Sequence, residues 1–78
     1  MEKHYLVLQN ILQDLDVRLF YNIILTDYSI CFTAKDNSKV REDIKRLFPE
    51  IEFETLLNEN TVGIIKTDDT FLYFHLNP

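Results

Sequence analysis

The sequence is poor in glycine, cysteine and histidine, and this scarcity excludes several kinds of site. It has one glycine, Gly63, whereas a phosphate-binding P-loop needs two glycines and a dinucleotide-binding fingerprint needs three. Its one cysteine, Cys31, has no partner for an intrachain disulfide. Its two histidines, His4 and His75, have no second histidine, cysteine or carboxylate at the spacing of metal ligands. We therefore expect no cofactor, no metal and no catalytic residue.

The sequence also lacks a long apolar run and an excess of basic residues. There is no run of about 18 apolar residues to span a membrane, and the first residues do not resemble a signal peptide. Together with the single cysteine, this favours a cytoplasmic protein. The 13 acidic and 8 basic residues give a net charge of −5. This charge argues against direct binding of nucleic acid or of a membrane, and it permits a partner protein with a basic surface.

The chain is long enough for one domain over residues 1–78. A predicted β-hairpin over residues 17–35 lies at the centre of this domain. The second strand, residues 28–35, alternates apolar and polar side chains, which is typical of a strand buried on one face. The first strand, residues 17–25, is apolar on both faces, because Phe20 and Ile24 lie opposite its other apolar residues. A strand of that kind needs cover on both faces, so we place it inside the sheet. The turn falls at Thr26 and Asp27.

Two helices and three further strands are predicted around this hairpin. Apolar spacings of three and four residues indicate helices over 2–15 and 38–48, the second capped by Asn37 or Ser38 and ended by Pro49. Alternating patterns indicate strands over 51–57, 62–66 and 70–76. We expect an α+β fold with the order α-β-β-α-β-β-β and a five-stranded antiparallel sheet in the order 2-1-5-4-3. Both helices would cover one face, and Gly63 would mark a bulge or a close backbone approach.

This arrangement leaves apolar side chains without cover. With both helices on one face, Phe20, Ile24 and one row of the last strand would face outward. An exposed apolar patch of this size usually marks an interface. The alternative is that the sheet curls and buries the row against the end of a helix.

A row of glutamates is the second candidate surface. Glu50, Glu52 and Glu54 recur at period two, so on a strand they share one face at intervals of about 6.5–7 Å. Phosphates along a DNA strand have a broadly similar spacing, so such a row can occupy a basic nucleic-acid-binding groove. The alternative is a solvated edge, where charges deter unwanted strand pairing. We add three acidic residues of the following turns to the predicted partner-binding set: Glu59, Asp68 and Asp69.

Other candidate sites carry less weight. A Cys31 nucleophile would need His75 or His4 beside it, and a small, half-buried thiol is the simpler interpretation. Five basic residues between 35 and 46 suggest RNA binding, but acidic residues interrupt them and no stacking aromatics accompany them. A helix with internal salt bridges explains them better.

The sequence therefore favours a non-enzymatic protein-binding module. In size, acidity and lack of motifs it resembles the small inhibitors that phages and mobile elements encode, among them anti-CRISPR proteins. The resemblance is one of composition, and it implies a viral or mobile-element protein that inhibits a nucleic-acid-handling protein. The main alternative is a structural homodimer, or a small subunit of a larger complex, that uses the apolar face of the sheet. A small enzyme and an RNA-binding protein are the remaining hypotheses.

Overall fold

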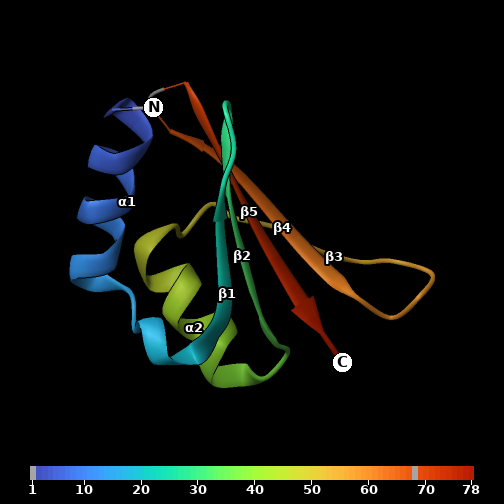
Figure 1. Cartoon of the computed structure of the whole chain (residues 1–78). Helices are drawn as coiled ribbons and strands as arrows, with labels where there is room; N and C mark the ends of the chain where they lie inside the picture. Colours follow the sequence, from blue (N-terminus) through green and yellow to red (C-terminus); the bar gives the residue numbers. More distant parts are fainter. Residues whose placement is uncertain (1, 68) are drawn as a thin grey trace.

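The computed structural model describes the backbone of residues 2–67 and 69–78, and the side chains of residues 5–67 and 69–78. The elements follow the order α1 (Glu2–Asp14), η1 (Val17–Leu19), β1 (Phe20–Leu25), β2 (Ser29–Lys35), α2 (Ser38–Leu47), β3 (Phe53–Thr55), β4 (Thr61–Thr67) and β5 (Thr70–Asn77). Both helices lie on the same side of a five-stranded sheet (Figure 1). The predicted α+β class and the two helices are confirmed. No helix in the described part of the chain is long and apolar enough to cross a membrane.

The observed order of strands in the sheet differs from the predicted order 2-1-5-4-3. The strands lie in the order β1-β2-β5-β4-β3, so β2 rather than β1 is the neighbour of β5. These two strands are parallel, and the other three pairings are antiparallel. The sheet is therefore mixed, and β1 is an edge strand. The physical reason is that β1 needs less cover on its outer face than its sequence predicts, because Phe20 is buried in the core at 8% exposure.

The start of β1 also differs from the prediction. Val17–Leu19 form a short 3-10 helix, in which the Asp16 carboxylate accepts a hydrogen bond from the Arg18 backbone N–H. The strand then begins at Phe20, and a register shift between Phe20 and Asn22 interrupts its pairing with β2. Such a bulge changes which side chains share a face. Phe20 consequently lies in the core, and the expectation that it faces outward is wrong.

The core lies between the helices and the inner face of the sheet. Val7 and Ile11 of α1 and Val40 and Ile44 of α2 are buried against side chains of β2 and β5. Three aromatic rings form its centre: the Phe32 and Phe74 rings stack at 4.9 Å, and Phe20 meets Phe32 edge-on at 5.6 Å. Aromatic contacts of this kind stabilise a core beyond the area that they bury. Residues that alternate with this row therefore face away from the helices.

The helix α2 has the N-cap that its sequence predicts. The Asn37 side chain accepts a hydrogen bond from the Val40 backbone N–H at 2.9 Å. Within the helix, Arg46 pairs with Asp43 at 2.7 Å. The same Asp43 carboxylate accepts the Asp16 backbone N–H at 2.9 Å, so α2 holds the loop that leads into β1.

Candidate functional site

The outer face of the sheet is the face away from the helices, and its side chains range from exposed to half-buried. It carries Asn22 and Ile24 of β1, Cys31 and Thr33 of β2, Phe71, Tyr73 and His75 of β5, and Val62, Ile64 and Lys66 of β4. The register sets them in rows across the sheet, because Ile24 pairs with Cys31, Cys31 with Tyr73, and Tyr73 with Ile64. The predicted outward row of the last strand and outward Ile24 are confirmed. Three of its apolar side chains are exposed, Ile24, Ile64 and Phe71, and exposed apolar side chains gathered on one face are typical of an interface.

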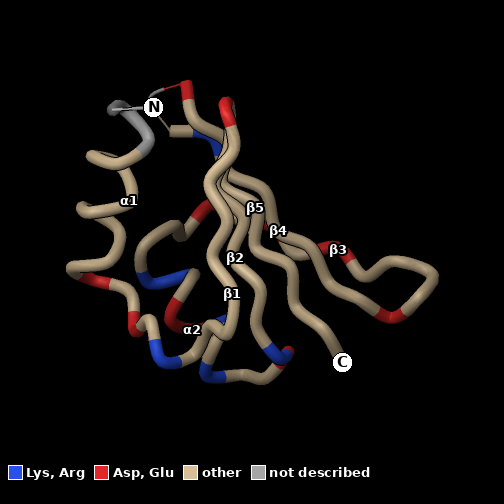
Figure 2. The backbone as a smooth tube through the Cα atoms, in the orientation of Figure 1, with Lys and Arg blue, Asp and Glu red and all other residues tan. Residues whose placement is uncertain are grey.

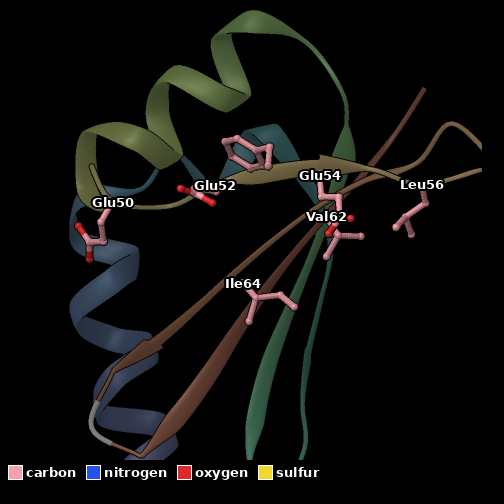
Figure 3. Close-up of a pocket in the computed structure, with 7 residues that line it drawn as sticks. Glu50, Glu52, Glu54, Leu56, Val62 and Ile64 are labelled. Atoms are coloured by element: carbon pink, nitrogen blue, oxygen red, sulfur yellow. The ribbon is translucent and has the colours of Figure 1, made fainter.

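An open groove of about 700 Å³ adjoins this face, with Glu50, Glu52 and Glu54 among its lining residues. The three glutamates follow one another along the segment that enters β3 (Figure 3). Val62 and Ile64 line the groove from β4 and also belong to the outer face, so the groove and the face are continuous. Leu56 completes the lining beyond Glu54. The glutamates that the sequence grouped together thus share one surface with apolar side chains.

The segment that carries the groove has no positive charge of its own. Residues 47–65 contain no lysine or arginine, and the projecting β3–β4 loop has no basic position in Figure 2. This loop also exposes Leu57 completely, and Glu59 adopts the left-handed conformation there with φ 71°. Because opposite charges attract and apolar side chains leave water, the groove suits a ligand surface that is basic and partly apolar.

Two other predicted residues lie elsewhere. Glu59 is exposed in the β3–β4 loop and does not line the groove. Asp69 follows the far end of β4, whereas β3 pairs with the beginning of that strand. The intervening strand length separates Asp69 from Glu54 by roughly 20 Å at about 3.4 Å per residue. Asp68 lies outside the described residues.

A polar network fixes the groove segment to the rest of the fold. Arg41 of α2 donates two hydrogen bonds to the Asp36 carboxylate, both at 2.7 Å, and a third to the Thr61 hydroxyl at 3.2 Å. The Thr61 hydroxyl lies 3.2 Å from that of Thr55, and the Arg41 guanidinium lies 5.4 Å from the centre of the Phe53 ring. Residues of β3 and β4 are thus held to α2 by one side chain.

The ion pair between Arg41 and Asp36 shifts the pKa of both groups. Hydrogen bonds from Arg41 lower the pKa of the Asp36 carboxyl below its usual value of 3.8, although partial burial opposes the change. The carboxylate in turn raises the pKa of the Arg41 guanidinium. Both groups are therefore charged near neutral pH, and the double hydrogen bond fixes their relative orientation.

Cys31 and His75, the candidate catalytic residues, are not hydrogen-bonded to each other in the structure. Cys31 and His75 lie on the same face of neighbouring strands, but the registered partner of His75 is Thr33. No hydrogen bond joins the thiol to the imidazole, and the buried Nε2 of His75 has no hydrogen-bond partner among the described groups. His4 contributes no side chain to the description. In the portion described, no three histidine, cysteine or acidic side chains are close enough to hold a metal ion.

Sequence reasoning missed part of the groove. Leu56 continues the period-two row of Glu52 and Glu54, so its place on the same face was readable from the sequence. Val62 and Ile64 join the groove only through the pairing of β4 with β3, which single-strand patterns do not specify. Arg41 gave no sequence signal, because its partners are spread over residues 36–61.

Comparison of the chain with protein-family models, with curated proteins and with solved structures finds no match.

Proposed function

We propose that this protein is a non-enzymatic protein-binding module that blocks the basic surface of a nucleic-acid-handling protein. The observation that carries the proposal is the union of Glu50, Glu52 and Glu54 with apolar Val62 and Ile64 in one groove. The carboxylates would take the positions of phosphates, and the apolar side chains would add contacts that a nucleic acid backbone does not make. Charge complementarity of this kind speeds association and selects the partner, while the apolar part slows dissociation.

The partner surface follows from the same chemistry. It would present lysine or arginine side chains beside an apolar or aromatic patch, because carboxylates pair best with guanidinium groups and the outer face offers only weak polar contacts. Binding would weaken with added salt, since the exposed carboxylates are screened by counterions. Nucleic acid would compete with the module for that surface.

Affinity capture from a lysate of the source organism or its host tests the proposal. The bait is the full chain, used at low and moderate salt, with and without excess duplex DNA as competitor. We expect capture of a nucleic-acid-handling protein that falls with salt and with DNA. The double variant Glu52→Gln, Glu54→Gln should lose it. The variant Glu42→Gln, Glu59→Gln removes two charges outside the groove and should retain it. Equal capture by the two variants would overturn the proposed site.

A second candidate function uses the apolar part of the same surface. Ile24 and Ile64 are 49% and 52% exposed on the outer face, and Phe71 is also exposed. A subunit that buries this face permanently, in a homodimer or a larger complex, would gain about 1 kcal/mol for each of these half-exposed side chains that it covers. In that case the glutamates only keep the chain in solution, and the Glu52→Gln, Glu54→Gln variant would assemble normally.

A further inference from the structure

The outward edge of β1 presents backbone groups without partners. The Thr26 backbone N–H donates to the Ser29 carbonyl at 2.8 Å at the end of the β1–β2 hairpin. In an antiparallel pair of strands, residues whose backbone N–H and C=O groups bond to the neighbouring strand alternate with residues whose backbone groups point away from it. Counting back from Thr26, Ile24 and Asn22 bond toward β2, whereas Leu25 and Ile23 direct their N–H and C=O groups outward. Among the residues described, no group bonds to them.

The two edges of the sheet differ in their protection. The β3 edge is only three residues long, Phe53–Thr55, and Glu52 and Glu54 place charges along it. Short length and charge are devices that prevent an edge from pairing with another chain. The β1 edge is six residues long, FYNIIL, and contains neither a charged residue nor a proline. The β1 edge therefore lacks the devices that keep the β3 edge from pairing with another chain.

We propose that β1 pairs antiparallel with β1 of a second copy of this chain across a two-fold axis. Centred on Ile24, this pairing places Ile23 of one copy opposite Leu25 of the other, so that their outward N–H and C=O groups form four backbone hydrogen bonds. The Ile24 side chains of the two copies then meet on the outer face. Two five-stranded sheets become one of ten strands, with all helices on one side. This dimer does not depend on the proposed function.

The distribution of charge is compatible with a second copy at this edge. Each chain carries a net charge of −5, so two copies repel unless their carboxylates stay apart. The groove glutamates lie at the β3 edge, and the sheet order puts β1 at the opposite edge. Pairing through β1 therefore keeps the two grooves at the far ends of the joined sheet. Both remaining edges are then charged β3 strands, so assembly closes at two copies.

Sedimentation velocity of the full chain from about 5 to about 500 μM tests the dimer. A small interface of this kind gives a dissociation constant on the order of tens of micromolar, which lies within this concentration range. We expect the mass to rise from that of one 9.3 kDa chain to twice that value and no further. A mass of one chain over the whole range would overturn the proposal, as would growth beyond two copies.

Two matched variants separate edge pairing from burial of the outer face. Ile24→Lys places a charge at the two-fold axis and should raise the dissociation constant at least about tenfold. Ile64→Lys changes an isoleucine of the same face with nearly the same exposure, 52% against 49%, but lies on β4 away from the edge. It should leave the dimer intact. Loss of the dimer in both variants would mean that the outer faces meet instead, and would refute the edge.

Hydrogen exchange on the unmodified chain provides a reading that does not rely on variants. The amide protons of Ile23 and Leu25 should exchange several-fold more slowly at 500 μM than at 5 μM, because the second copy accepts their hydrogen bonds. The Ile24 amide, already bonded within the sheet, should change much less. Equal exchange of Ile23 and Leu25 at both concentrations would contradict β1 pairing even if a dimer forms.

Discussion

Gly63 is the position where the fold and the groove are most tightly coupled, and Gly63→Ala is the most informative single change. An added Cβ there would lie 2.8 Å from Cδ1 of Ile51 and 2.8 Å from Cε1 of Phe53. These distances are well below van der Waals contact. Ile51 is buried at 2% exposure, so its side chain has little room to move. The backbone at Gly63 has no positive φ, so the glycine is required by close approach and not by its own conformation.

The size of the effect follows from two opposing terms. Overpacking by one methyl group in a well-packed site costs about 1–3 kcal/mol. Replacing glycine by alanine within a strand stabilises the folded state by about 0.5–1 kcal/mol, since alanine loses less backbone freedom on folding. The midpoints give a net loss of about 1 kcal/mol in the free energy of unfolding. For a domain of 60–100 residues this lowers the melting temperature by about 4–8 °C.

Urea unfolding followed by circular dichroism measures this loss, because the chain has no tryptophan to report by fluorescence. Phe53→Leu removes the nearest ring carbon, so the double variant Gly63→Ala, Phe53→Leu should be more stable than the sum of the single effects predicts. A coupling of about 0.5 kcal/mol or more is expected for residues in contact. If Gly63→Ala is neutral or stabilising, or if the two changes add independently, the close-approach argument fails.

Two further predictions concern the elements that hold the groove segment. Arg41 lowers the folded-state pKa of Asp36 below 3.8. The ion pair of Asp36 with Arg41 therefore contributes fully to stability above pH 3.8, and this contribution is lost as the pH falls through the lower folded-state pKa. Asp36→Asn should therefore lower stability near pH 7, by at most about 1 kcal/mol for this partly exposed pair, and the gap to the unmodified chain should narrow in urea unfolding curves at pH 3. Asn37→Ala should cost about 1 kcal/mol by removing the N-cap of α2, whereas Ser38→Ala at the neighbouring exposed position should cost less in the same assay; the reverse order would show that Ser38 is the true cap.

Sequence patterns predict a helix or strand when the interactions that stabilise it come from residues nearby in the chain. The core stripe of α2 and its Asn37 cap both lie within ten residues of one another, and the structure places that helix at Ser38–Leu47. The turn near Asp27 is set by its own hairpin. In contrast, the 3-10 helix at Val17–Leu19 depends on Asp16, whose backbone N–H is held by Asp43 from 27 residues away. A strand pattern through Val17 could not anticipate that contact.

The candidate surface was predictable only along its own strand. Period two correctly joined Glu52 to Glu54, and continued to Leu56. It gave no basis for excluding Asp69, because proximity to the groove depends on which end of β4 meets β3. The contribution of Val62 and Ile64 required the same knowledge. Sequence reasoning thus recovers a row of side chains but not the surface that several strands build together.

The wrong sheet order has a cause that bears on the dimer. The sequence pattern predicts that a strand apolar on both faces lies in the interior, where neighbours cover it, and this prediction puts β1 beside β5. The bulge at Phe20–Asn22 turns Phe20 inward, so that one of the apolar side chains that need cover is buried within the same chain. Ile24 remains at 49% exposure on an edge without charge. The apolar pattern that misplaced β1 within one chain is the pattern expected of a strand that lies inside a larger sheet, and pairing of two β1 edges would give it that position.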